Sequence, residues 1–238
     1  MHGSVGTGPA TWGALQPLAE RYDLVVPNRG GYPPNPPLER IDFEQQAEEL
    51  APLLADGAHL VGHSYGGVIS LLIAARHPDS VRSLTVNEPP AFGVARGRPE
   101  IEKLVAGLDA FFQAGPHEPA AFLRGFLAAV GSDTKLPDPL PPELEHGARA
   151  SMAERPPWEA EIPLDVLAAS GLRVLVVRGD WCPAPDSARE RAGAAFHAIC
   201  DVIERRLTAE TACFPASHGP QRLGKPFNDR LRAFWESH

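Results

Sequence analysis

The chain has 238 residues, of which 43% are hydrophobic and 22% are charged, and its formal net charge is −8. This composition is ordinary for a globular protein, and the length is sufficient for a sizeable core. Acidic and basic residues are interspersed without a basic stripe, which argues against nucleic acid as a partner because phosphate contacts need clustered Lys and Arg.

Other classes of protein and partner are also disfavoured. No apolar run approaches the ~20 residues that cross a bilayer, and the N-terminus shows no signal peptide. We therefore expect a cytoplasmic protein without a membrane partner. The three cysteines show no metal-ligand spacing, and their odd number argues against a disulfide framework. No metal or other cofactor is expected, and the sequence does not indicate an oligomeric state.

Apolar runs alternate with helical patterns along the chain. The predicted strands are 23–27, 59–62, 81–87, 172–177 and 210–214. The predicted helices of the same region are 43–55, 68–76, 188–207 and 226–235. Strands that alternate with helices predict an α/β fold with a mostly parallel sheet flanked by helices.

Residues 92–165 interrupt this alternation. Residues 101–114 and 120–130 have helical patterns with no convincing strand between them. We interpret 92–165 as a helical cap or lid inserted into a core formed by 1–91 and 166–238, because such insertions commonly line the binding crevice of open α/β sheets. A long surface excursion is the alternative interpretation.

The candidate nucleophile is Ser64, in the G-x-S-x-G motif formed by Gly62-His63-Ser64-Tyr65-Gly66. An apolar strand precedes the motif and an apolar helix follows it, as expected for a sharp turn that exposes a serine above a sheet. Flanking glycines remove Cβ atoms that would clash in such a turn. The first free N–H groups of the helix, including that of Tyr65, can hold a developing oxyanion.

The candidate general base is His218. A neutral serine is a weak nucleophile and needs a base, for which histidine is the best-matched side chain. Of the nine histidines, His218 comes directly after the last predicted strand, which places it at the same edge of the sheet as Ser64. The chain order Ser, acid, His also puts the base last.

With these motifs the sequence resembles the α/β-hydrolase fold superfamily, as a serine esterase-like member, over essentially the whole chain. His2-Gly3-Ser4 looks like the oxyanion loop of that family, and 28–32 (NRGGY) looks like the loop after its fourth strand. The resemblance implies a catalytic triad and an oxyanion hole formed by the backbone N–H groups of Tyr65 and Ser4. The assignment of Ser4 comes from the resemblance alone.

The acid of the triad is open. Many α/β-hydrolases carry it three residues after the glycine that ends their seventh strand, but here Cys182 stands at that distance from Gly179. Glu88, at the end of the preceding strand, is one candidate, and a subgroup of the haloalkane dehalogenases looks similar in this respect. Asp180 is the competing candidate and Asp186 is a third.

The resemblance also implies an apolar strand directly before His2, where the chain has only Met1. The first three strands of the family are therefore expected to be absent. A start that lies further upstream would explain this, as would another segment or chain that fills the gap.

The predicted function is hydrolysis of a carboxylic ester through an acyl-enzyme, with an apolar, ester-like small molecule as substrate. Seven apolar residues of the presumed lid are candidates for the substrate-binding wall: Leu104, Leu108, Phe111, Phe112, Phe122, Phe126 and Leu127. The same triad could act on lactones, thioesters or carbon–carbon bonds, and one scaffold hosts many chemistries. A non-catalytic small-molecule-binding protein on this fold is the alternative from another class.

Overall fold

The computed structural model describes residues 1–54, 57–130 and 135–237. Its described part contains one parallel sheet with the strand order β1-β2-β3-β4. The strands are β1 (Ala58–His63), β2 (Val81–Asn87), β3 (Val174–Gly179) and β4 (Glu210–Phe214). Each of them lies where the sequence predicts a strand.

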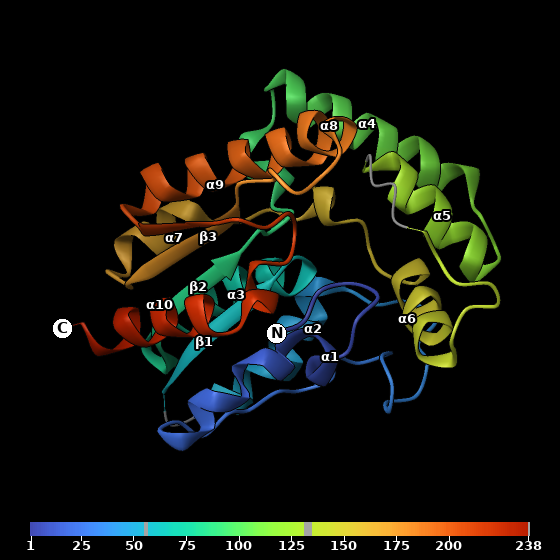
Figure 1. Ribbon diagram of the computed structural model, residues 1–238. Coiled ribbons are helices and arrows are strands. Elements are labelled where there is room, and N and C mark those ends of the chain that lie inside the picture. Colours follow the sequence, from blue (N-terminus) through green and yellow to red (C-terminus); the bar gives the residue numbers. More distant parts are fainter. Residues whose placement is uncertain (55–56, 131–134, 238) are drawn as a thin grey trace.

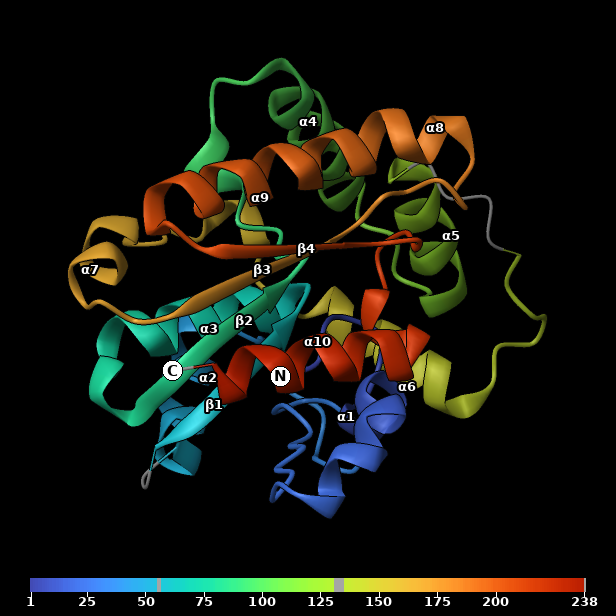
Figure 2. The ribbon, with the colours of Figure 1, turned by 60° about the vertical axis from the view of Figure 1, so that its left-hand side comes forward.

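Helices cover both faces of this sheet. The longer helices of the core are α2 (Phe43–Leu50), α3 (Tyr65–Arg76), α9 (Ala194–Leu207) and α10 (Lys225–Glu236). On β3, Val174 and Val176 belong to the core cluster that includes α3 and α9, whereas Leu175 and Val177 pack with α10. Alternating residues of one strand therefore enter two cores, and Figure 2 shows α10 on one side of the sheet and α3 on the other. The predicted fold class is confirmed.

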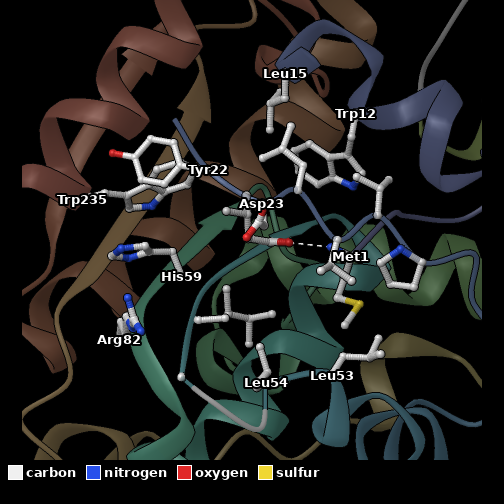
Figure 3. Close-up of a pocket in the computed structure, with 18 of the residues that line it drawn as sticks. Met1, Trp12, Leu15, Tyr22, Asp23, Leu53, Leu54, His59, Arg82 and Trp235 are labelled. Atoms are coloured by element: carbon white, nitrogen blue, oxygen red, sulfur yellow. Dashed lines mark hydrogen bonds between the residues drawn. The ribbon is translucent and has the colours of Figure 1, made fainter. Parts of the chain in front are cut away.

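The predicted strand at 23–27 is wrong. The segment lies outside the sheet, and Val25 is 65% exposed. A cavity of about 400 Å³ lies between this segment and β1 and is lined by residues of both (Figure 3). Beside β1, the terminal amino group of Met1 donates to the Val61 carbonyl at 2.5 Å. A buried strand needs partners for its backbone groups, and no strand in the described ranges pairs with 23–27, so the apolar side chains alone do not make it a strand.

Three long helices lie between β2 and β3 and gather at one end of the molecule (Figure 1). They are α4 (Pro99–Ala114), α5 (Pro119–Ala129) and α6 (Pro142–Met152). The first two match predicted helices. The sequence pattern missed α6 because the prolines that precede it look like loop punctuation, although Pro142 occupies the first helical turn, where proline is favourable. We call α4, α5 and α6 the helical insertion.

Two predicted helices are continuous in sequence but not in geometry. Residues 188–207 form the end of α8 (Asp186–Ala188), a π-helical turn η6 (Arg189–Gly193) and α9. The helix predicted at 43–55 is α2 followed by the 3-10 turn η2 (Ala51–Leu54), and Ala55 lies outside the described residues. Pro52 explains the change, because it has no N–H for the α-helical hydrogen bond.

Short helices complete the described fold. They are α1 (Gly8–Trp12), α7 (Leu164–Ala169) and the turns η1 (Gly13–Glu20), η3 (Pro78–Ser80), η4 (Phe92–Ala95), η5 (Pro157–Glu159) and η7 (Pro220–Leu223). The predicted boundary between insertion and core, at 165/166, falls inside α7. Across the described ranges, no helix combines the length and apolarity that a membrane span requires.

Candidate active site

Ser64 occupies the sharp turn between β1 and α3. Its φ of 51° lies in the left-handed region, which a residue with a side chain rarely adopts. The neighbouring glycines permit this turn: a Cβ atom on Gly62 would lie 2.4 Å from Ser70 Oγ, and one on Gly66 would lie 2.4 Å from the His2 carbonyl oxygen. The sequence motif therefore folds into the strained turn that its glycines predict.

Backbone strain is concentrated around this turn. Of the five non-glycine residues with positive φ in the described ranges, four are Val5, Ser64, Glu88 and Trp181, with φ between 47° and 66°. Val5, Ser64 and Trp181 line one cavity, and Glu88 lies directly behind it in contact with Trp181. Strained residues persist where the surrounding structure holds them, and they cluster at functional sites.

The cavity has a volume of about 600 Å³, within the range of small-molecule sites. Ser64 and His218 both line it, together with Ser4 and Tyr65. Six of the seven apolar residues predicted for the substrate-binding wall also line it; they are Leu104, Leu108, Phe112, Phe122, Phe126 and Leu127. Phe111 instead packs against neighbouring phenylalanines in the helical insertion. The serine and the histidine, distant in sequence, thus open into one mostly apolar space.

Glu88 is the carboxylate that contacts His218. The Nδ1 atom of His218 lies 3.0 Å from Glu88 Oε2. The other carboxylate oxygen, Oε1, accepts hydrogen bonds from the Gly179 backbone N–H at 2.8 Å and from Trp181 Nε1 at 3.0 Å. The Glu88 side chain is fully buried. A buried carboxylate with these donors is fixed in orientation, and Nδ1 of His218 is engaged while Nε2 is left for another partner.

The competing carboxylates have other surroundings. Asp180 Oδ1 accepts a hydrogen bond from the backbone N–H of Cys182, in its own loop. Asp186 has a side chain that is 78% exposed and pairs with Arg189. Of the three candidates that the sequence left open, Glu88 is the one that contacts His218.

His63 holds the loop of His218 from the β1 side. Its Nε2 lies 2.7 Å from the His218 carbonyl oxygen, so it carries the proton and donates. Burial, followed by the charge of the nearby His218, lowers the pKa of His63 well below 6.5. A neutral, donating imidazole at this position fixes the backbone from which His218 extends.

The N-terminal loop lies directly beside the candidate nucleophile. A Cβ atom on Gly3 would be 2.8 Å from Ser64 Cβ, and Ser4 lines the same cavity. His2 is buried, accepts from the Arg29 N–H at Nε2, and contacts the Gly3 carbonyl oxygen through Nδ1 at 2.8 Å. Burial, with a smaller effect of Arg29, lowers the pKa of His2 to about 2, so the ring is neutral. The loop is therefore held by a buried imidazole.

Sequence reasoning missed Trp181 and Glu154, which both line the cavity. Trp181 follows Asp180 in the loop that was searched for an acid, and its indole N–H was an available signal because a buried tryptophan usually finds an acceptor. Glu154 has no motif around it. In the described ranges no group of three or more His, Cys, Asp or Glu residues is arranged to hold a metal ion.

A parallel sheet covered by helices on both faces, with a strained serine at a strand-to-helix turn and a carboxylate-bound histidine near the same edge, defines an α/β protein of hydrolase type. The family model for the alpha/beta hydrolase fold matches residues 1–145. The chain belongs to this family.

Curated relatives include two bacterial enzymes named pimeloyl-[acyl-carrier protein] methyl ester esterase. The chain is 32% identical to the one from Aeromonas hydrophila over 184 residues, which cover 74% of this chain and 66% of the relative. It is 35% identical to the one from Aromatoleum aromaticum over 138 residues, covering 54% and 53%. The match thus spans between about half and two thirds of the length of these relatives.

Solved structures also share the fold. MenH from S. aureus has a TM-score of 0.67 at 14% identity, with 98% of this chain and 91% of that chain covered. The 2-hydroxy-6-oxo-6-phenylhexa-2,4-dienoate hydrolase from Rhodococcus sp. strain RHA1 has a TM-score of 0.64 at 17% identity, with 100% and 89% covered. At such low identity these similarities concern the fold alone.

Proposed function

We propose that the chain hydrolyses a carboxylic ester through an acyl-enzyme, with Ser64 as nucleophile, His218 as general base and Glu88 as the acid of the triad. The observation that carries this proposal is the 3.0 Å contact between His218 Nδ1 and Glu88 Oε2, made by a histidine that lines the same cavity as Ser64. A base needs such a carboxylate to fix its tautomer and to stabilise the imidazolium that forms.

In the proposed reaction, Ser64 Oγ attacks the ester carbonyl carbon while His218 Nε2 accepts the hydroxyl proton. The imidazolium is stabilised by Glu88, and the tetrahedral oxyanion accepts hydrogen bonds from the backbone N–H groups of Tyr65 and Ser4. The intermediate then collapses as His218 returns the proton to the leaving alkoxide, which departs as the alcohol. Water repeats the same steps on the acyl-enzyme and releases the carboxylic acid, with Ser64 restored.

The cavity favours an apolar acyl or alcohol group. The helical insertion contributes leucine and phenylalanine side chains to its wall, and burial of such groups stabilises a bound chain by about 0.8 kcal/mol per methylene. The names of the curated relatives, which describe esterases of an acyl methyl ester, support the same substrate class. We propose an ester of an apolar acyl chain as the substrate.

Replacing Ser64 with alanine tests the proposal. We expect Ser64→Ala to lower kcat for a short-chain aryl ester by about 10⁴-fold or more, because the alcohol that forms the acyl-enzyme is gone. A fluorophosphonate probe should label the unaltered protein at Ser64, as identified by mass spectrometry, and leave the variant unlabelled. Equal hydrolysis by both proteins would disprove the role of Ser64. Binding of an apolar ester without labelling of the folded, unaltered protein would instead favour a binding protein.

A further inference from the structure

The two residues proposed to supply the oxyanion hole are both tied, through their side chains, to a single dipeptide. Ser4 Oγ donates to Glu154 Oε2 at 2.5 Å. Tyr65 Oη donates to the backbone carbonyl of Arg155 at 3.0 Å. Glu154 and Arg155 follow Ala153, the residue that caps the end of α6, in the segment that leaves the helical insertion. One short segment therefore holds both halves of the proposed oxyanion hole.

This dipeptide is itself fixed to the core by backbone hydrogen bonds. The Ile41 N–H donates to the Ala153 carbonyl at 2.8 Å, and the Arg155 N–H donates to the Ile41 carbonyl at 2.7 Å. The two bonds form a parallel bridge between Ile41 and Glu154. The tethers from Ser4 and Tyr65 thus end on backbone whose position the core determines.

A buried ion pair fixes the carboxylate that accepts the Ser4 hydroxyl. Glu154 Oε1 accepts from Arg29 Nη2 at 2.5 Å and from Tyr32 Oη at 2.8 Å, which leaves Oε2 for Ser4. The side chains of Arg29 and Glu154 are 0% and 6% exposed. Charges that are buried this deeply must be paired and hydrogen-bonded, so the orientation of the carboxylate is strongly determined.

Arg29 also acts on the peptide unit whose N–H group would face the oxyanion. Its Nη2 donates to the Gly3 carbonyl at 3.1 Å, and His2 Nδ1 donates to the same oxygen at 2.8 Å. The Gly3 carbonyl and the Ser4 N–H belong to one planar trans peptide unit, so they point in opposite directions. Two donors that hold the carbonyl on the buried side therefore turn the Ser4 N–H away from them, toward the cavity that Ser4 lines.

The second half of the hole is held in a similar way. The Arg29 guanidinium carbon lies 4.8 Å from the centre of the Tyr65 ring, so the aromatic face and the hydroxyl of Tyr65 are both engaged. Burial, followed by the charge of Glu154, raises the pKa of the Tyr65 phenol. The hydroxyl stays protonated and remains a donor to Arg155, which fixes the residue whose backbone N–H begins α3.

We propose that Arg29, Glu154 and the Arg155 carbonyl are positioning elements of the oxyanion hole: they orient the backbone N–H groups of Ser4 and Tyr65 through the Gly3 carbonyl and the Ser4 and Tyr65 hydroxyls. This proposal rests on the proposed esterase function. It makes the exit of the helical insertion part of the catalytic geometry, because these groups act on the two backbone N–H groups through the hydrogen bonds described above.

The test removes one tether at a time and leaves the buried ion pair intact, because a variant at Arg29 or Glu154 could fail to fold. Ser4→Ala and Tyr65→Phe each delete one hydroxyl. We expect each to lower kcat for an aryl ester by roughly 10-fold, since small misplacements of oxyanion donors are costly, while KM changes less than about twofold. Ser4→Thr, which keeps a hydroxyl, should restore most of the loss.

A thionoester distinguishes misplaced oxyanion donors from a general loss of structure. Its sulfur is a weaker hydrogen-bond acceptor than oxygen, so the hole contributes less to its hydrolysis. The ratio of kcat/KM for the ester to that for the matched thionoester should therefore fall by about 5- to 10-fold in both variants. Ser83→Ala and Tyr22→Phe are the matched controls, because each deletes a hydroxyl that hydrogen-bonds away from the cavity.

The outcomes separate the two proposals. Ester hydrolysis and phosphonate labelling by the unaltered protein, with lowered kcat and a lowered ester-to-thionoester ratio in the two variants alone, would support the positioning role. An active protein whose variants match the controls, or lose kcat with an unchanged ratio, would overturn that role and leave the esterase function standing. An unaltered, folded protein without hydrolysis or labelling would overturn both.

Discussion

The loops that follow β2 and β3 each begin with a carboxylate at the same edge of the sheet, yet the two carboxylates have different surroundings. Glu88, directly after β2, is fully buried and contacts Gly179, Trp181 and His218. Asp180, directly after β3, is partly exposed and bonds to the backbone of its own loop. Of the carboxylates at these two neighbouring strand ends, Glu88 therefore contacts the histidine and Asp180 does not.

The difference comes from the backbone at the two strand ends. The Glu88 N–H still donates to the Val177 carbonyl, so the residue remains within the ladder between β2 and β3 while its φ of 47° turns the chain. Asp180 stands at the equivalent place after β3, and its N–H likewise donates to a neighbouring strand, at the Phe214 carbonyl of β4. The turn there falls one residue later, at Trp181, whose φ is 58°. The two strand ends therefore differ in where the strained residue falls: it is the carboxylate residue itself after β2, and the residue following the carboxylate after β3.

Among the substitutions at these two strand ends, Glu88→Gln is expected to have the largest effect on activity. The amide would donate to His218 Nδ1, so the imidazole would carry its proton on Nε2 and could not accept the proton of Ser64. We expect kcat for an aryl ester to fall by roughly 10³- to 10⁴-fold. Asp180→Asn is the matched control, with an expected change below about twofold. Steady-state kinetics measure both, and the reverse ranking would assign the acid to Asp180.

The second prediction concerns His63, whose Nε2 donates to the backbone carbonyl of His218. Burial lowers the pKa of His63 in the folded protein, so the unfolded chain binds a proton below about pH 6.5 that the folded protein does not. The free energy of unfolding therefore decreases as the pH is lowered below about 6.5, and it no longer depends on this group above that pH. Between pH 7 and pH 5, His63→Gln should lose about 2 kcal/mol less stability than the unaltered protein.

Chemical denaturation at the two pH values measures this difference. The glutamine can still donate to the His218 carbonyl, so the comparison isolates the titrating group from the hydrogen bond. Parallel losses of stability in the two proteins would show that His63 binds its proton equally well when folded, which would contradict the assigned neutral state.

The smallest effect is expected for Trp181→Phe. The variant keeps an aromatic ring next to Phe196 but removes the indole N–H that donates to Glu88 Oε1. The Gly179 N–H still bonds to the same oxygen, so the carboxylate stays close to its position. We expect kcat to fall by about 3- to 10-fold, less than for Glu88→Gln. An effect as large as that of Glu88→Gln would mean that the indole, more than the Gly179 N–H, determines the orientation of Glu88.

Much of the fold and part of the candidate site could be predicted from the sequence. Four strands and the turn at Ser64 have local signals, because apolar periodicity and the two glycines around Ser64 act within a few residues. The segment 23–27 carries the same apolar signal and is not a strand, since a strand also requires a neighbour to pair with. The acid could only be narrowed to three carboxylates, because their contacts depend on how two strand ends are aligned.

The sequence is enough to predict the alternation of strands and helices, the turn at Ser64 and the position of His218 after the last strand, because each depends on nearby residues. The folded structure is needed to show that Glu88 and not Asp180 contacts His218, and that Glu154, 150 residues from Ser4, accepts the hydrogen bond of the Ser4 hydroxyl. These contacts join segments far apart in the chain, and their partners are selected by register, burial and charge pairing, which exist only once the chain has folded.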